Sequence, residues 1–135
     1  MDEELILWKN DYDTGIEQID SQHQELLDIV NRLLLASEEF KTVDTERFLI
    51  WVMPGIKALE DHFSTEEKWM EEKNYIKLTE HKQKHDRMLI DLKEILDEVQ
   101  SGKRKPELLT LALYVREWFI KHIYEQDIPM GEAFK

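Results

Sequence analysis

Two pairs of residues in this sequence have the spacing of metal ligands on a helix. The stretch HKQKH at 81–85 places His81 and His85 four residues apart, and Glu66 follows His62 at the same interval. Residues four apart are separated by only about 40° around an α-helix, so each pair projects from one face and could chelate a single ion. The lysines between the two histidines are expected to face water.

All five histidines fall on the apolar face of a predicted helix. A single core histidine is usually satisfied by one neighbouring hydrogen bond, and a single His–Glu pair is usually a solvated ion pair. Five buried imidazoles would each need a partner, and a carboxylate at position 66 would find no Lys or Arg on these inner positions. A shared metal site accounts for all the histidines, which are His23, His62, His81, His85 and His122.

Other metal motifs are poorly supported. A zinc-protease helix needs Glu directly after its first histidine as general base, whereas position 82 is Lys. Diiron bundles of the ferritin type carry Glu three residues before a ligand histidine on two helices, and no histidine here has that Glu. The chain has no cysteine, which excludes thiolate sites, iron–sulfur clusters and disulfides.

Four predicted helices must position these ligands. Residues 1–16 lack a helical period and contain the turn pair Thr14-Gly15, so we expect an extended arm packed by Trp8. Thr42 or Asp44 can cap the second helix. Apolar residues at three- and four-residue spacings predict helices over about 17–37, 44–74, 78–101 and 106–128.

Proline and glycine positions refine these boundaries. Pro54-Gly55 is expected to kink the second helix without ending it, and Ser101-Gly102 should end the third. Pro106 is expected at the first position of the fourth helix, which Pro129 should terminate. The predicted architecture is an all-α antiparallel up-down four-helix bundle at about 17–128, within a single domain of residues 1–135 that includes the arm at about 1–16.

Composition narrows the classes of function. The chain has 135 residues, of which 41% are hydrophobic and 36% charged, as expected for one soluble globular domain. A net charge of -12 would repel phosphate backbones, and GKRK at 102–105 is the longest basic cluster, so no nucleic-acid partner is expected. No apolar run approaches the roughly 20 residues of a membrane span, and the acidic start is unlike a signal peptide. We therefore expect a cytoplasmic location.

The motifs together resemble the hemerythrin family, most closely its single-domain bacterial members. The resemblance covers essentially the whole chain, from Trp8 through GIEQIDSQHQEL (15–26), HFSTEEKWM (62–70), HKQKH (81–85) and WFIKHIYEQD (118–127). It implies two iron ions, Fe2+ or Fe3+, joined by an oxo or hydroxo bridge. In this arrangement His81, His85 and His122 bind one iron, His23 and His62 bind the other, and Glu66 and Asp127 bridge both.

Asp127 follows from the family pattern alone. It lies five residues after His122, which is about 140° around an ideal helix, so spacing would have favoured Glu125 or Gln126 as the donor. We hypothesise that the helix frays or widens just before Ile128-Pro129 and lets the aspartate swing inward.

The resemblance implies reversible dioxygen binding, for oxygen transport, storage or delivery. Five imidazoles, two bridging carboxylates and the shared oxygen fill eleven of the twelve positions of two octahedral irons. Dioxygen takes the vacant position, on the iron with two histidines, as a hydroperoxide whose proton comes from the bridging hydroxide, so no catalytic residue is needed. Imidazoles also suit zinc, copper and nickel, and only the resemblance selects iron.

By the same analogy, five apolar residues line the dioxygen site and keep water from it; they are Leu26, Phe63, Trp118, Phe119 and Ile123. Plain core packing is the alternative role for each of them. Phe119 departs from the family pattern, in which well-known oxygen carriers have leucine, and a larger ring there affects pocket size, oxygen access and autoxidation.

Three rival functions remain open on the sequence. The same irons could serve an enzyme that reduces peroxide or nitric oxide, although a histidine-rich ligand set favours holding peroxide over splitting it. An oxygen or redox sensor is a second rival, and it would need an oxygen-consuming or signalling protein as partner or a longer parent chain. A purely structural metal site is the third, but such sites normally leave no coordination position empty.

Overall fold

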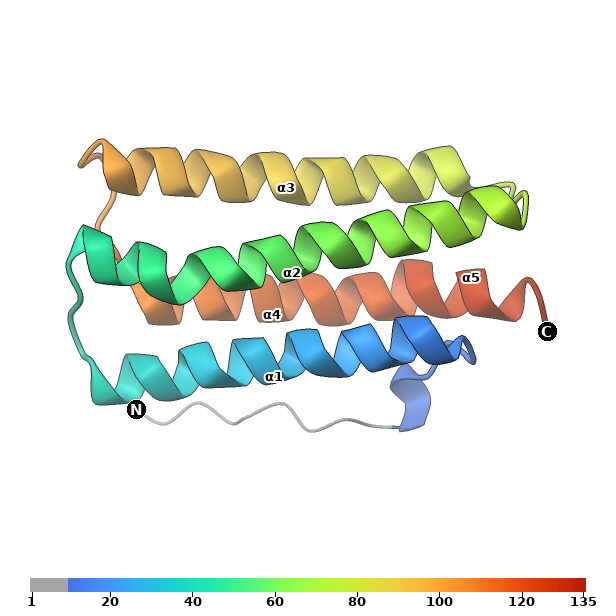
Figure 1. Ribbon diagram of the computed structural model, residues 1–135, viewed down its shortest axis with the longest axis horizontal. Coiled ribbons are helices and arrows are strands. Elements are labelled where there is room, and N and C mark those ends of the chain that lie inside the picture. The colour runs from blue at the N-terminus through green and yellow to red at the C-terminus, as the bar shows by residue number, and fades with distance from the viewer. Residues whose placement is uncertain (1–9) are drawn as a thin grey trace. The chain divides into compact units, whose positions relative to one another are not determined.

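The computed structural model describes residues 10–135, and within that range every regular element is a helix (Figure 1). The predicted packing of Trp8 lies outside the described residues. The elements are η1 (Asn10–Tyr12), α1 (Glu17–Glu39), α2 (Thr45–Glu72), α3 (Leu78–Gln100), α4 (Leu108–His122), the π-helical turn η2 (Ile123–Asp127) and α5 (Ile128–Glu132). None of these helices is long and apolar enough to cross a membrane.

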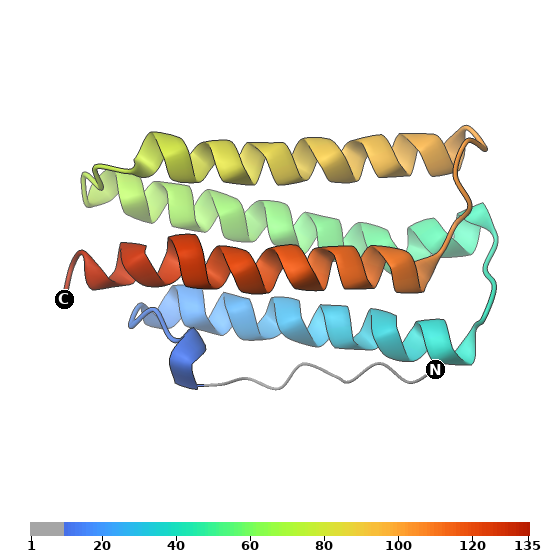
Figure 2. The same cartoon turned by 180° about the vertical axis from the view of Figure 1, so that it is seen from behind.

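The described residues fall into two compact units. The first joins residues 10–42 to Glu107–Lys135, and the second is Val43–Pro106. In the first unit α1 runs antiparallel to α4, and η2 and α5 continue α4 in the same direction (Figures 1 and 2). The α1 residues at three- and four-residue spacings are buried as predicted, namely Ile19, His23, Leu26, Leu27, Val30, Leu33 and Leu34.

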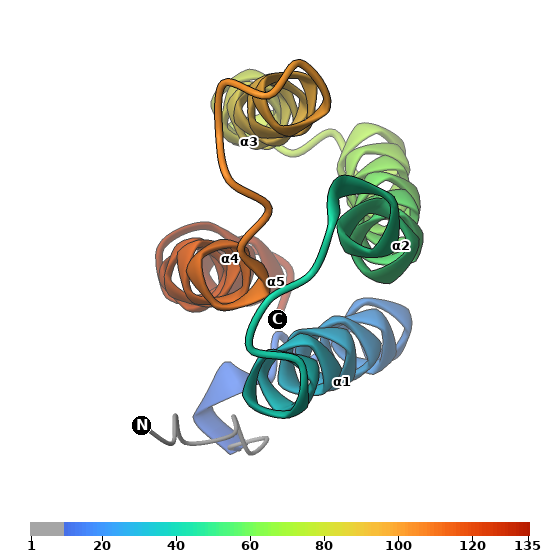
Figure 3. The ribbon, with the colours of Figure 1, turned by 90° about the vertical axis from the view of Figure 1, so that its left-hand side faces the viewer.

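The second unit is a helical hairpin of α2 and α3, whose pairing is also seen end-on in Figure 3. Asp44 caps α2, since its Oδ1 accepts a hydrogen bond from the backbone N–H of Arg47 at 2.8 Å. Pro54 lies inside α2, which continues through it to Glu72, so the prediction that this proline does not end the helix is confirmed. Gly102 follows α3 with φ +82°, a left-handed conformation that suits glycine after a helix.

The start of α1 is held by side-chain hydrogen bonds from the preceding turn. Carboxylate oxygens of Asp20 accept hydrogen bonds from the backbone N–H of Thr14 at 2.8 Å and from that of Gly15 at 3.2 Å. The hydroxyl of Thr14 donates to Asp20 at 2.7 Å. The expectation of a wholly extended arm is wrong at Asn10–Tyr12, where the chain forms one 3-10 turn.

Both expectations for the ends of the fourth helix are also wrong. Pro106 lies before α4, whose N-cap is Glu107 and whose first residue is Leu108. Pro129 does not terminate the helical path, because it falls in the first turn of α5, directly after the π-helical turn η2, and the first turn of a helix is where a proline is best accepted. The helical segment therefore runs to Glu132 and passes through a π-helical turn that the sequence period did not predict.

Candidate metal centre

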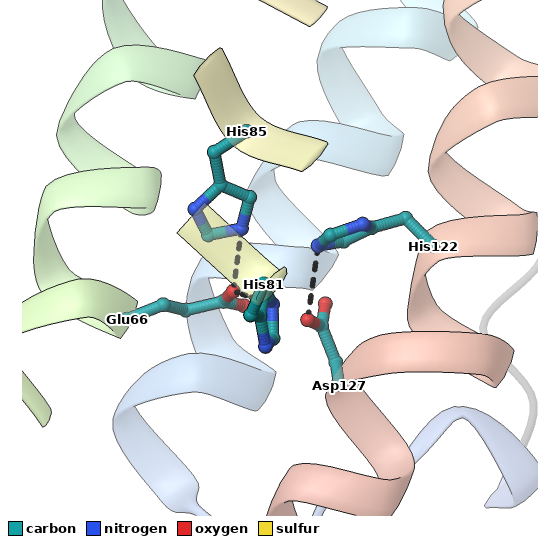
Figure 4. Close-up of side chains that lie close together, drawn as sticks. All are labelled: Glu66, His81, His85, His122 and Asp127. Atoms are coloured by element: carbon teal, nitrogen blue, oxygen red, sulfur yellow. Dashed lines mark ion pairs between the residues drawn. The ribbon is translucent and has the colours of Figure 1, made fainter. Parts of the chain in front are cut away.

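In the second unit, α2 and α3 together surround one carboxylate with three imidazoles. Nε2 of His62 lies 2.7 Å from Oε2 of Glu66, one turn later on α2. Nε2 of His81 and Nε2 of His85 on α3 lie 3.2 Å and 3.1 Å from the other oxygen, Oε1, as Figure 4 shows. The four side chains are buried, with at most 1% of each residue exposed. The hairpin thus presents donor atoms from both helices at one carboxylate.

His85 is fixed on three sides by residues of α2. Its Nε2 faces Glu66, and its Nδ1 donates a hydrogen bond to Oε2 of Glu67 at 2.8 Å. The ring of Phe63 stacks on the imidazole with 3.9 Å between ring centroids and 6° between planes. Burial lowers the pKa of His85, but the hydrogen bonds to Glu66 and Glu67 raise it by more, so the net pKa lies above its ordinary 6.5.

Glu67 is a residue that the sequence analysis missed. It follows the predicted ligand Glu66 directly, and an acidic residue at such a position suggests on sequence alone only a solvated side chain. In the structure its side chain is 23% exposed. The signal that could have found it is general: a metal-binding histidine commonly donates its second ring N–H to a carboxylate.

In the first unit, one carboxylate lies between imidazoles of two helices. Nε2 of His23 on α1 lies 3.0 Å from Oδ2 of Asp127. Nε2 of His122, the last residue of α4, lies 3.1 Å from Oδ1 of the same aspartate (Figure 4). The three residues expose no more than 4% of their surface. Each unit therefore contains a buried carboxylate whose two oxygens face different histidines.

The π-helical turn explains how Asp127 reaches its position. The backbone N–H of Ile128 bonds to the carbonyl of Ile123, five residues earlier, instead of four as in an α-helix. This wider turn returns Asp127 to the face that carries His122, and the predicted widening of the helix is confirmed. Of the two donors that regular spacing would have favoured, Glu125 is exposed and Gln126 is half-buried.

The chemistry of the donor set fits a metal. Glu66, His81 and His85 each offer a donor atom within 4.8 Å of the other two, and the pairs His62–Glu66, His23–Asp127 and His122–Asp127 are equally close. Imidazole nitrogen and carboxylate oxygen are the protein ligands of nonhaem iron and zinc. Carboxylates this deeply buried are costly unless a cation compensates them.

The structure brings two of the predicted pocket residues beside histidines of the first unit. The ring of Trp118 stacks on His122 with centroids 4.5 Å apart, and Phe119 meets His23 edge-on at 5.3 Å. Phe119 is 1% exposed, whereas Trp118 is half-buried. Leu26 and Ile123 of this unit and Phe63 of the second unit are buried as well.

Comparison with known proteins agrees with this donor set. The family model described as the hemerythrin HHE cation binding domain matches residues 14–128. A bacteriohemerythrin of Clostridium acetobutylicum is 30% identical over 129 residues, which cover 91% of this chain and 96% of that protein. A bacteriohemerythrin of Stenotrophomonas maltophilia is 27% identical over 131 residues, which cover 97% and 82%.

Solved structures extend the likeness to the fold. The crystal structure of a wild-type hemerythrin matches with a TM-score of 0.84 at 25% identity, covering 96% of this chain and 97% of that one. A leucine-to-alanine mutant of hemerythrin matches with the same TM-score at 25% identity and 96% coverage of each chain. The fold is an all-α four-helix bundle, as the sequence predicted, and the family model covers most of it. The chain belongs to the hemerythrin family.

Proposed function

We propose that this protein binds dioxygen reversibly at a nonhaem diiron centre and serves as an oxygen carrier, store or delivery protein. Membership of the hemerythrin family supports a nonhaem iron site. The named relatives are bacteriohemerythrins, and the matches cover 96% and 82% of their lengths. The donor set of five imidazoles and two carboxylates supports the same assignment.

The observation that carries the proposal is how the two carboxylates divide their oxygens. Oε1 of Glu66 faces His81 and His85, whereas Oε2 faces His62. Oδ1 of Asp127 faces His122, whereas Oδ2 faces His23. If each carboxylate bound a single ion, its two oxygens would not need to face different histidines. The observed contacts are instead those expected for two ions, each bound by one oxygen of both carboxylates.

The proposal gives each ligand a place. His81, His85 and His122 would hold one iron, His23 and His62 the other, and Glu66 and Asp127 would contribute one oxygen to each. Two irons that prefer six ligands each would then retain open positions for exogenous ligands, on the ion with two histidines in particular. When bound as a ferrous pair, the irons supply the two electrons and the open position that dioxygen binding needs.

We propose that the apolar residues beside the ligands act by excluding water from the site. Phe63, Trp118 and Phe119 place aromatic rings against His85, His122 and His23 respectively. Apolar walls beside the ligands limit solvent access and so slow irreversible oxidation of the irons. We propose that these rings, with Leu26 and Ile123, form the walls of the dioxygen site, and that the bulk of Phe119 restricts access to it.

The test is a cycle of oxygen exposure on iron-loaded protein. Anaerobically reduced protein is measured by optical spectroscopy before exposure to air, after exposure, and after oxygen removal under vacuum, with zinc-loaded protein as the control. A charge-transfer band that appears with oxygen and fades on its removal supports the carrier. Irreversible yellowing, or turnover of peroxide or nitric oxide faster than by free iron, would favour an enzyme and contradict the proposal.

A further inference from the structure

The carboxylate of Glu67 lies beside the candidate metal centre and is not one of its predicted ligands. Its Oε2 accepts the hydrogen bond from Nδ1 of His85 at 2.8 Å. His85 is completely buried, so this nitrogen has no access to bulk water. Both partners belong to the second unit, one on α2 and the other on α3.

Three residues of α2 hold this one imidazole. Phe63, Glu66 and Glu67 occur at positions i, i+3 and i+4, which bring their side chains to neighbouring positions on one side of a helix. Phe63 covers a face of the ring, Glu66 meets Nε2 at 3.1 Å, and Glu67 meets Nδ1 at 2.8 Å. Both ring nitrogens and one ring face are therefore held from the same helix.

A neutral imidazole carries one proton, and its position decides which nitrogen can bind a metal. Without Glu67, a neutral His85 would gain most by donating its Nε2–H to Glu66, which leaves no lone pair on Nε2 for an ion. An acceptor at Nδ1 stabilises the other tautomer, in which Nε2 is bare. The acceptor also raises the basicity of Nε2 as a ligand.

We propose that Glu67 is a positioning residue, which holds the Nδ1–H of His85 and thereby presents Nε2 to the metal. This inference rests on the proposed function, because His85 is assigned there to the iron with three histidines. Lys82 on the surface of α3 lies 4.0 Å from Glu67 and 3.0 Å from Asp86, so Glu67 sits between the buried ring and a solvent-exposed charge pair.

The alternative for Glu67 is a surface acid that contributes only a weak ion pair to Lys82. An ion pair at 4.0 Å with a lysine that is half exposed would have little effect on either metal binding or the His85 ring. The two roles differ in what happens at Nδ1 of His85, which can be observed directly.

The test compares Glu67→Ala and Glu67→Gln with wild type and with Glu71→Gln, a matched exposed acid one turn later on α2. The first readout is nuclear magnetic resonance of metal-free protein labelled with 15N at histidine, at a pH at which the His85 imidazole is neutral. We expect the Nδ1–H signal of His85 in wild type, Glu71→Gln and Glu67→Gln, since an amide oxygen still accepts the hydrogen bond. Glu67→Ala should lose that signal.

The second readout is the release of ferrous iron to a chelator under anaerobic conditions. Glu67→Ala should weaken iron retention by about 10- to 100-fold, Glu67→Gln by less, and Glu71→Gln not at all. An unchanged Nδ1–H signal or unchanged iron retention in Glu67→Ala would overturn the inference. If wild type binds no iron but its Nδ1–H signal still depends on Glu67, the diiron assignment fails while the positioning of the ring is supported.

Discussion

Nε2 of His122 lies 3.1 Å from Oδ1 of Asp127, although the two residues are five positions apart. A regular α-helix would turn them about 140° away from each other. The π-helical turn η2 at Ile123–Asp127 removes that difference and brings the aspartate to the histidine face. The position of the second carboxylate of the candidate centre thus depends on a local change of helix type. Single π-helical turns often occur at functional sites.

Replacing Asp127 tests this relationship. Asp127→Asn keeps the size of the side chain but removes its charge, and we expect the iron content of anaerobically loaded protein to fall well below two per chain. Because we propose that Asp127 bridges both ions, the affinity for iron should fall by about tenfold or more. Glu125→Gln, in the same turn but exposed, should bind iron as wild type does. Equal loss of iron in the two variants would contradict the assignment of Asp127.

The helices and six of the seven predicted ligands follow from the sequence because burial imposes a simple period on each helix. His23, His62, His81, His85 and His122 occupy positions where apolar residues are expected, and all are buried. Asp127 lies outside that period, and only family resemblance selected it. A single π-helical turn depends on which backbone hydrogen bonds form locally, and the spacing of apolar residues does not predict these bonds.

Other features depend on contacts between segments that are distant in sequence. The hydrogen bond from His85 to Glu67 joins α3 to α2 and leaves no pattern in either helix. The predicted helix ends at Pro106 and Pro129 differ from the observed ends by a turn or less. A proline is accepted both in the first turn of a helix and just before it, so its position does not define the exact boundary.

Removing a histidine that is proposed to bind only one iron should lower the iron content by one ion per chain. His122→Leu retains the bulk of the side chain but has no donor, so we expect iron stoichiometry to fall from two toward one. Oδ1 of Asp127 would also lose its imidazole partner, with a cost of about 1–3 kcal/mol to folding. Iron analysis and thermal unfolding measure the two effects. Unchanged iron stoichiometry would show that His122 is not a ligand.

Lys82→Ala is the corresponding control within the HKQKH stretch. The Lys82 side chain is 51% exposed and pairs with Asp86 one turn later at 3.0 Å. An exposed pair of this kind contributes little, so iron content should be unchanged and unfolding should shift by less than about 1 kcal/mol. A large loss of iron in this variant would mean that substitutions in this stretch lower the iron content by disturbing the fold.

Gly131 provides a test of how α5 packs on the turn before α1. A Cβ atom at this position would overlap the backbone carbonyl of Thr14, which cannot move as a flexible side chain could. Gly131→Ala in a helix would normally stabilise, but here we expect a loss of about 1–3 kcal/mol in denaturant unfolding. Glu132→Ala, at the next and exposed position, should lie within about 0.5 kcal/mol of wild type. A stabilised Gly131→Ala variant would contradict this packing.

Tyr124 links η2 to the residues before α1 in a way that pH can probe. Its hydroxyl donates to Asp11 at 2.8 Å, and this hydrogen bond raises the pKa of Tyr124 to about 12. The contact is therefore fully present below the usual tyrosine pKa of about 10 and is lost as the pH rises through the folded value. Asp11→Asn should lower the pKa, as measured by the ultraviolet absorbance of the phenolate, whereas Asp13→Asn should not. Equal phenolate titrations in the two variants would exclude the contact.

The most direct test of the two-iron centre is a crystal structure of the anaerobically iron-loaded protein with anomalous diffraction at the iron edge. We predict two iron peaks. Nε2 atoms of His81, His85 and His122 should ligate one and those of His23 and His62 the other, with Glu66 and Asp127 bridging. A single peak, or two peaks with a different division of the histidines, would contradict the account.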